Sequence, residues 1–231
     1  MKYRHKHDPF RLLVIFLCAA SLLCLLPQKS CARAAFSHGS RENKSIALTF
    51  DDGPHPRYTP QILALLDKYQ IRATFFMIGC NAELYPDVAK AVAAGGHEIG
   101  NHTYSHPHMK SITAETLREE IGKTEDVLDG LGIKKPLLFR PPEGFRSIAQ
   151  IEATEALGYR MIVWSLDTHD WKGKSKGELT NFVLGTVQGG DVLLFHDYVS
   201  GKNTTITALE ELIPKLLKDG YRFVTVSELM C

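Results

Sequence analysis

Four side chains are of the types, and at the spacing, that metal-dependent hydrolysis needs. Asp51 and Asp52 are adjacent and come directly after an apolar run that ends at Phe50. Adjacent carboxylates that leave a strand point in different directions, so one can bind a metal ion while the other stays free as a base. His102 and His106 are four residues apart, and this spacing brings two imidazoles to one face of a helical turn.

Together, these side chains provide a ligand set for zinc. Two histidines and one carboxylate bind catalytic zinc and leave its fourth position open for water. Zinc lowers the pKa of bound water to roughly 7 and polarises a bound carbonyl. Simpler explanations exist, because Asp-Gly-Pro at 52–54 is an ordinary turn sequence and surface histidines are common. Pro107 disfavours helix at His106, so we expect a short turn there.

Three further segments carry side chains suited to the same chemistry, namely 140–144 (RPPEG), 167–171 (DTHDW) and 193–197 (LLFHD). Arg140 stays cationic at any working pH and can hold a catalytic carboxylate ionised, and the two prolines stiffen the loop so that a backbone N–H can be aimed. Asp170 and Trp171 place an acid beside an aromatic ring that can stack on a sugar. His196 follows an apolar run and could act as a general acid. Each residue also has a simpler interpretation: Arg140 could be a surface arginine, Trp171 a core residue, and His196 a buried structural histidine.

Apolar runs alternate with amphipathic stretches from residue 45 to the end of the chain. Short strands are predicted at 45–50, 74–78, 97–99, 137–140, 160–164, 191–195 and 222–226. Helices are predicted at 59–70, 82–94, 113–131, 148–157, 176–187 and 205–218. This alternation predicts an α/β fold with a parallel sheet covered by helices, which could close into a barrel or stay open. The five polar clusters each follow a predicted strand, and in a βα barrel such loops share the face where catalytic groups collect.

The first 34 residues have the three parts of an export signal. Basic residues precede an unbroken run of apolar and small residues at 12–26, which is shorter than the ~20 residues of a membrane span. Ala34 closes a small-x-small cleavage site. We therefore expect 1–34 to be a signal peptide cleaved after Ala34 or an uncleaved anchor that tethers the protein to the membrane through 12–26. Residues 35–44 are expected to be a linker and 45–231 a single domain outside the cytoplasmic membrane.

Composition and charge exclude some classes of protein. Hydrophobic residues make up 44% of the 231 residues and charged residues 23%, which is typical of a globular protein. The net charge is +1, but residues 1–34 hold six Lys and Arg against one Asp, so the remainder carries −4. A mildly acidic domain without a basic stripe argues against nucleic-acid binding. Beyond the N-terminal segment the cysteines are Cys80 and Cys231, which could pair in an oxidising compartment or stay free.

Taken in order, the five clusters resemble those of the polysaccharide deacetylase family, the NodB-homology domain of carbohydrate esterase family four. The matching sequences are Thr-Phe-Asp-Asp-Gly at 49–53, His-Thr-x-x-His at 102–106, Arg-Pro-Pro-x-Gly at 140–144, Asp-x-x-Asp-Trp at 167–171 and Leu-x-His at 194–196. The resemblance runs from Ser45 to Met230. It implies a distorted (β/α)7 barrel.

The resemblance also implies the catalytic machinery. Asp52, His102 and His106 would bind the metal, usually zinc. Asp51 would be the general base and His196 the general acid.

Supporting roles follow from the same resemblance. Arg140 would position the base, and Asp170 would tune the acid. Trp171 and Leu194 would line a pocket for the acetyl methyl group. The backbone N–H of Glu143 would complete an oxyanion hole. The family often has an aromatic residue where Glu143 stands, so the wall of the substrate site changes here from an aromatic surface to a carboxylate.

The activity implied is hydrolysis of N-acetyl groups on an amino-sugar polysaccharide. Export without an added carbohydrate-binding module favours a substrate in the cell envelope, namely N-acetylglucosamine in peptidoglycan. Muramic acid, chitin oligomers, poly-N-acetylglucosamine and acetyl xylan are alternative substrates. Two other classes are an inactive carbohydrate-binding domain and a general zinc amidase or peptidase. Retention of all the catalytic residue types argues against an inactive domain. The Asp-x-x-Asp-Trp and Leu-x-His clusters argue against a general zinc amidase or peptidase.

Overall fold

The structure is a computed structural model that describes residues 34–198 and 203–231. The segment 1–34, with its predicted signal peptide or anchor, lies outside these residues except for Ala34, so its role stays a prediction. Within the two described ranges, no helix has the length and apolar character needed to cross a membrane.

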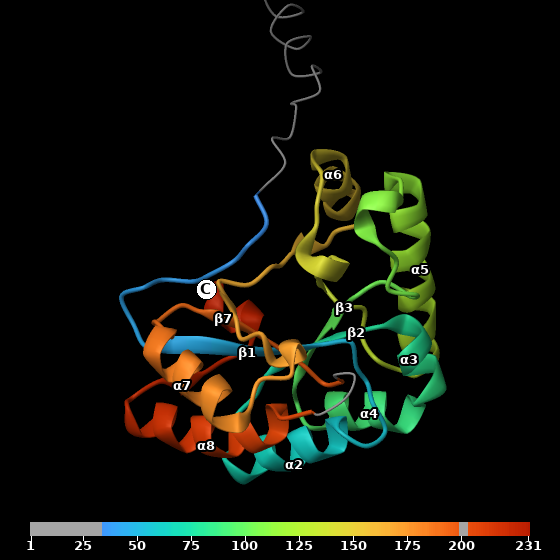
Figure 1. Ribbon diagram of the computed structural model, residues 1–231. Coiled ribbons are helices and arrows are strands. Elements are labelled where there is room, and N and C mark those ends of the chain that lie inside the picture. Colours follow the sequence, from blue (N-terminus) through green and yellow to red (C-terminus); the bar gives the residue numbers. More distant parts are fainter. Residues whose placement is uncertain (1–33, 199–202) are drawn as a thin grey trace, which may run out of the picture. The chain divides into compact units, whose positions relative to one another are not determined.

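A parallel sheet forms the centre of the domain (Figure 1). Its strands lie in the order β5-β4-β3-β2-β1-β7-β6, and β8 pairs with the start of β1. The strand bounds are β1 Ser45–Asp51, β2 Thr74–Met77, β3 Glu98–Asn101, β4 Leu138–Phe139, β5 Arg160–Met161, β6 Leu166–Asp167, β7 Val192–His196 and β8 Arg222–Phe223. Every residue of β1 is buried, as expected for the central strand of a parallel sheet covered on both faces.

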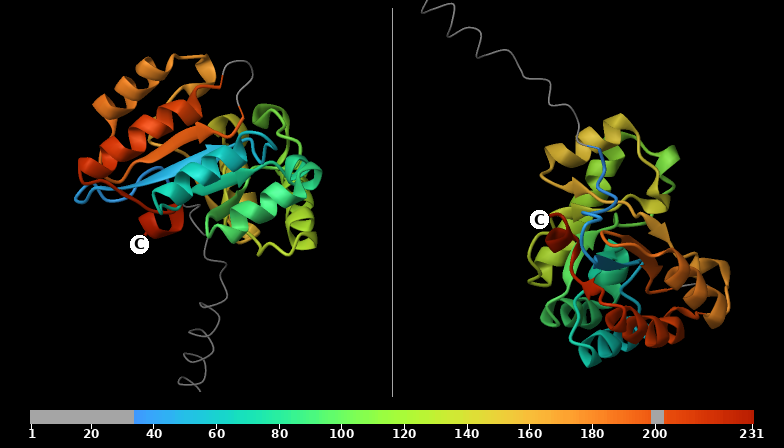
Figure 2. Two further views of the ribbon diagram at one scale, coloured as in Figure 1. Left: turned by 90° about the horizontal axis from the view of Figure 1, so that it is seen from below. Right: turned by 90° about the vertical axis from the view of Figure 1, so that its left-hand side faces the viewer.

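Helices surround the curled sheet, with α7, α8, α2 and α4 along one side and α3, α5 and α6 along the other (Figures 1 and 2). The helix bounds are α2 Thr59–Lys68, α3 Gly79–Leu84, α4 Pro86–Ala94, α5 Ala114–Gly130, α6 Ile148–Ala156, α7 Lys176–Thr186, α8 Thr205–Lys218 and α9 Val226–Leu229. Short 3₁₀ turns occur at Met109–Ser111, Pro142–Gly144 and Asp170–Lys172. This arrangement confirms the predicted distorted (β/α)7 barrel, whose seven-stranded path ends at β5 and β6.

Three element predictions differ from the structure, one of them at the C-terminus, where Val226 begins helix α9 instead of ending a strand. The helix expected at 82–94 is two helices, α3 and α4, because Pro86 begins α4 and cannot continue a preceding helix. Strand β6 was not predicted, since it follows the strand expected at 160–164 without an intervening helix, so the alternation of strands and helices gives no signal for it. Thr113, the first residue of the helix expected at 113–131, caps α5, because its side chain accepts a hydrogen bond from the N–H of Thr116.

The segment expected to be a linker, 35–44, joins the barrel where the sheet is open. Phe36 forms a parallel bridge with Ile162, and His38 forms an antiparallel bridge with Asp191. The N–H of Phe36 lies 2.9 Å from the carbonyl oxygen of Met161, and its own carbonyl accepts the N–H of Val163 at 2.8 Å. The segment pairs in this way because backbone groups at an open sheet edge need partners and the Phe36 ring packs on an apolar cluster.

The parallel register brings the chemically active strand ends together. Asp51 at the end of β1 is the pairing partner of His196 at the end of β7. On the other side, Asp51 pairs with Phe76, and Asn101 at the end of β3 pairs with Phe139. Phe50, which precedes Asp51 and faces the opposite side of the sheet, stacks on Phe75 at 5.0 Å between centroids, in an apolar cluster shared with α2 and α8. This packing holds the strands that end at the polar rim.

Candidate active site

A cleft of about 610 Å³ opens at the carboxyl ends of the strands. It is lined by Asp51, Asp52, His102, His106, Glu143, Trp164, Asp167, Trp171, Leu194, His196 and Tyr198. Eight of the ten site residues proposed from the sequence are in this list. The other two, Arg140 and Asp170, are buried and touch the cleft residues Asp51 and His196. The structure thus brings all five sequence clusters to one place.

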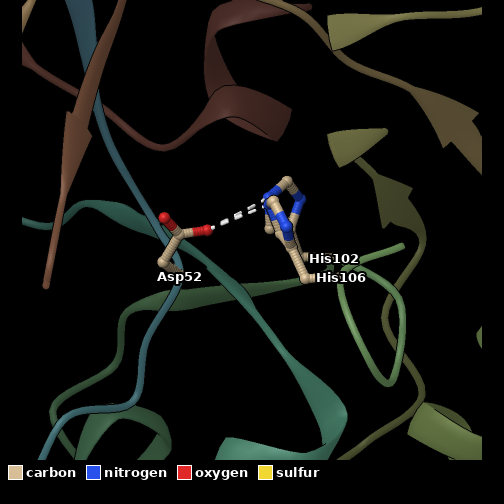
Figure 3. Close-up of side chains that lie close together, drawn as sticks. All are labelled: Asp52, His102 and His106. Atoms are coloured by element: carbon tan, nitrogen blue, oxygen red, sulfur yellow. Dashed lines mark ion pairs between the residues drawn. The ribbon is translucent and has the colours of Figure 1, made fainter. Parts of the chain in front are cut away.

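Three potential metal ligands converge in this cleft (Figure 3). Oδ1 of Asp52 lies 3.5 Å from Nε2 of His102 and 3.3 Å from Nε2 of His106. Ligand atoms at zinc distances in a tetrahedral site are about 3.3 Å apart, so the spacing fits that geometry. The two histidines meet through a turn, not a helix, because Thr103 and His106 have positive φ angles of 69° and 54°.

The hydrogen bonds of the ligand residues leave their metal-facing atoms free. Nδ1 of His102 lies 2.8 Å from the carbonyl oxygen of Arg140. A carbonyl can only accept, so the proton is on Nδ1 and the lone pair of Nε2 points into the cleft. Oδ1 of Asp52 is buried and has no hydrogen-bond partner among the described residues. A buried carboxylate oxygen without a donor is expected where a cation completes the site, so these residues fit a divalent metal.

The surroundings of Asp52 and His106 favour the deprotonated forms that metal binding requires. Burial alone would raise the pKa of Asp52, but His102, His196 and His106 outweigh that effect and hold its pKa below the ordinary value. Burial, together with the neighbouring His102, lowers the pKa of His106. Both shifts favour coordination at neutral pH.

The loop that carries both histidines is held by a buried carboxylate of α5. Oε2 of Glu120 accepts the backbone N–H groups of Tyr104 at 3.0 Å and Ser105 at 2.7 Å. Its Oε1 accepts the Ser105 hydroxyl at 3.0 Å. Glu120 is only 8% exposed. Sequence reasoning missed this residue, although a charged side chain next to Ile121 on the apolar face of a helix is a usable signal.

Asp51 is paired with a fully buried arginine. Nη1 of Arg140 donates to Oδ1 of Asp51 and to Oγ1 of Thr49, each at 2.7 Å. The guanidinium carbon lies 4.0 Å from the centroid of the Phe76 ring. Burial lowers the pKa of Arg140 and the charge of Asp51 raises it in part, yet a guanidinium stays protonated in proteins. The second carboxylate oxygen, Oδ2, lies 3.8 Å from Nε2 of His102 and so faces the ligand cluster.

His196 is paired with a buried aspartate. Nδ1 of His196 lies 2.8 Å from Oδ1 of Asp170, and the backbone N–H of His196 donates to Oδ2 at 2.9 Å. Thr205 donates a third hydrogen bond to this carboxylate at 2.8 Å. Burial opposes the charge on His196, but the hydrogen bond and charge of Asp170, with smaller effects of Asp51 and Asp52, raise its pKa to about 9. His196 therefore carries a proton at neutral pH.

The walls of the cleft combine apolar and polar side chains. Leu194 is buried, whereas Trp171 is 49% exposed. Glu143 has a φ of 58°, which is uncommon for a residue other than glycine, and its Oε1 lies 2.7 Å from Nδ1 of His108. The next residue, Gly144, also has a positive φ, and a Cβ there would lie 2.5 Å from the Trp164 ring. Glycine is therefore required beside Trp164.

Sequence reasoning also missed three residues at the cleft. Trp164 and Tyr198 line it, but neither belongs to a recognisable cluster. Asp197 lies behind it, where the carboxylate accepts a hydrogen bond from the Thr59 hydroxyl and the backbone N–H donates to the carbonyl of Asp51 at 3.0 Å. Burial, with the charges of Asp52 and Asp51, raises the pKa of Asp197 to about 7. The sequence placed Asp197 beside His196 but assigned it no role.

Comparison with known proteins agrees with the geometry. The profile described as polysaccharide deacetylase matches residues 38–162. Two peptidoglycan-N-acetylglucosamine deacetylases of Bacillus cereus are 43% and 42% identical in sequence to this chain. The alignments cover 81% and 83% of this chain and 88% and 70% of those proteins.

Solved structures show the same fold. A peptidoglycan N-acetylglucosamine deacetylase in complex with 4-naphthalen-1-yl-N-oxidanyl-benzamide has a TM-score of 0.81 at 39% identity, over 84% of this chain and 91% of that one. A pseudoenzyme of carbohydrate esterase family four from Bacillus anthracis has a TM-score of 0.79 at 30% identity, over 85% of this chain and 68% of that one. Since a pseudoenzyme shares the fold, the fold alone does not establish catalysis. On sequence, fold and site together, this chain belongs to the polysaccharide deacetylase family.

Proposed function

We propose that this chain is an exported, zinc-dependent enzyme that removes N-acetyl groups from N-acetylglucosamine residues of peptidoglycan. The observation that carries the proposal is the convergence of three kinds of group on one cleft. These are the cluster Asp52, His102 and His106, the carboxylate of Asp51, and the protonated imidazole of His196.

The mechanism assigns one proton transfer to each flanking residue. A metal bound by the three ligands would polarise the acetyl carbonyl and activate a water molecule. Asp51, aligned by Arg140, accepts the proton of the water as its oxygen forms a bond to the carbonyl carbon. His196, oriented by Asp170, donates its proton to the sugar nitrogen as the carbon–nitrogen bond breaks. The products are acetate and a free amino sugar.

The other cleft residues bind and orient the acetyl group. Leu194 and Trp171 provide an apolar wall for its methyl group. The backbone N–H of Glu143 is proposed to stabilise the charge that develops on the carbonyl oxygen. Because the donor is the backbone N–H, the Glu143 side chain does not interfere with stabilisation of the oxyanion. Its carboxylate is instead proposed to influence which substrate binds.

Zinc is proposed because of the donor set. Two imidazoles and one carboxylate suit zinc and related transition metals better than magnesium or calcium, which prefer oxygen ligands. Export is proposed because residues 1–34 read as a signal peptide or anchor, and because peptidoglycan lies outside the cytoplasmic membrane.

The test is acetate release from defined polymers by the purified, zinc-loaded chain. Peptidoglycan, chitin oligomers and acetyl xylan are compared at equal acetyl content, and mass spectrometry of the digested peptidoglycan shows which sugar has lost its acetyl group. We expect acetate from peptidoglycan, with the loss on glucosamine. Deacetylation confined to muramic acid or to acetyl xylan would contradict the proposed substrate, and hydrolysis of a peptide bond alone would contradict the reaction.

A further inference from the structure

Three aromatic rings from two distant segments stack on one another beside the cleft. His55 stacks against both Tyr58 and Tyr198, with ring centroids 4.7 Å and 4.9 Å away, and the two tyrosine rings lie 6.4 Å from each other. The planes of His55 and Tyr198 differ by only 9°. The guanidinium of Arg57 lies 5.5 Å from the Tyr58 ring. Of the three rings, Tyr198 is the one that lines the cleft.

The His55 ring is held in place by the backbone around it. Nδ1 of His55 accepts the N–H groups of Arg57 at 3.2 Å and Tyr58 at 3.3 Å. The N–H of His55 donates to the Thr59 hydroxyl at 2.8 Å. Ring and backbone are therefore both anchored at the start of α2, so Tyr198 packs on a support that is already ordered.

The exposure of Tyr198 is unusual for an aromatic ring. It remains 45% exposed although His55 covers one face of it. In the described part of the chain, the large hydrophobic side chains that are exposed include two aromatic ones, Tyr198 and Trp171, and both line this cleft. Exposed aromatic surface at a concave site marks a place where a ligand binds. None of the catalytic steps uses Tyr198.

We propose that Tyr198, supported by His55 and Tyr58, is a stacking subsite for a pyranose ring of the glycan chain, next to the sugar that loses its acetyl group. This inference rests on the proposed function. An aromatic ring covers the apolar face of a sugar, and its phenolic hydroxyl can still bond to water or to the sugar. A ring that is already stacked on its support loses little conformational freedom on binding, and this improves affinity. The subsite would therefore favour polymers over small acetylated compounds.

The test separates long from short substrates. Acetate release is measured from a pentamer of N-acetylglucosamine and from 4-nitrophenyl acetate, which reaches only the acetyl pocket. For Tyr198→Ala we expect KM for the pentamer to rise about three- to tenfold, as for the loss of one aromatic contact, with no change on the aryl ester. Tyr198→Phe keeps the ring and should behave like the wild type. Ile148→Ala, which removes an exposed side chain outside the cleft, is the matched control.

Binding without turnover provides a second readout. Calorimetry compares the affinity of Asp51→Asn for the pentamer with that of Asp51→Asn carrying Tyr198→Ala, and we expect the same three- to tenfold difference. Equal affinities, or an equal loss on pentamer and aryl ester in the kinetic test, would overturn the subsite. A wild-type chain that binds the pentamer through Tyr198 yet releases no acetate from either the pentamer or peptidoglycan would contradict the proposed function and leave the subsite standing.

Discussion

Each of the two residues proposed to transfer a proton, Asp51 and His196, is paired with a buried side chain of opposite charge. Asp51 is bound by Arg140 at 2.7 Å, and His196 by Asp170 at 2.8 Å. Buried ion pairs cost desolvation energy, and removing one partner leaves a charge without compensation. These pairs fix both position and charge, so a substitution in either pair should lower the stability of the chain as well as change its kinetics.

Replacement of the base should separate chemistry from metal binding. We expect Asp51→Asn to lower kcat about 10²- to 10⁴-fold, the range for loss of a general base, because an amide cannot accept the proton. Bound zinc, measured by atomic emission after gel filtration, should stay near one per chain, since Asp51 is not one of the three proposed ligands. Asp52→Ala is the comparison and should lose both metal and activity. An Asp51→Asn enzyme with a near-normal rate would show that another group is the base.

The charge of Asp170 should set the alkaline limit of activity. His196 must be protonated to act as the acid, so the rate is expected to fall as pH rises through its pKa of about 9. Asp170→Asn removes the charge that raises this pKa, and the alkaline limb of the kcat profile should move to lower pH. Asp167→Asn, which also changes a carboxylate at the cleft, should leave the limb in place. If Asp170→Asn and the wild type had the same limb, His196 would not be the titrating acid.

Single elements position the ligands through their ends and through one buried face. Strand β1 ends at Asp51, directly before Asp52, and β3 ends directly before His102. Strand β7 ends at His196, which pairs with Asp51. Helix α5 contributes through Glu120, whose carboxylate holds the turn between His102 and His106. A turn with positive φ angles at two residues other than glycine needs such support, because that conformation is costly.

Loss of the Glu120 carboxylate should weaken metal binding from outside the ligand set. We expect Glu120→Ala to raise the zinc Kd about 10- to 100-fold, as for other groups that orient metal ligands. Glu120→Gln should have a smaller effect, since its amide oxygen can still accept the Tyr104 and Ser105 N–H groups. The Kd is measured by competition with a chelator, and the Tm of the metal-free chain reports any general loss of stability. Glu119→Ala, on the exposed face of α5, is the control. Equal zinc affinity in both alanine variants would exclude this positioning role.

At the scale of the whole molecule, the barrel is completed by a segment that precedes its first strand. Strands β5 and β6 are the two ends of the sheet path. Residues 36–38 form bridges to Ile162 and Asp191 at this opening. The segment thus supplies backbone partners and an aromatic side chain at the place where an open sheet would expose both.

The Phe36 ring should therefore contribute to global stability. We expect Phe36→Ala to reduce the free energy of unfolding by about 1–3 kcal/mol, less than for a fully buried phenylalanine because the ring is only partly covered. The measurement is urea denaturation of the full chain, with Phe36→Leu as the variant that keeps most of the apolar volume. Glu42→Ala, an exposed change in the same segment, should be close to neutral. A Phe36→Ala chain as stable as the wild type would mean that the contacts of the Phe36 ring contribute nothing to the free energy of unfolding.

Local patterns were enough to predict most of the fold. The apolar runs and their spacing predicted the order of strands and helices, because burial imposes a periodicity that a short window of sequence shows. They failed at β6, which no helix separates from the preceding strand, and at 35–44, whose pairing is long-range. Pro86 could have indicated the break between α3 and α4, since proline cannot lie inside a helix without cost.

The sequence by itself determined which chemical groups the site contains and that they follow strands, because each residue type and each strand end is a local property. The tertiary structure decided which atoms meet. The 3.3 Å between Asp52 and His106, the support of Glu120 and the stack of His55 on Tyr198 depend on segments far apart in the chain. Such contacts are set by the register of parallel strands and the packing of helices on them, and no local pattern encodes these.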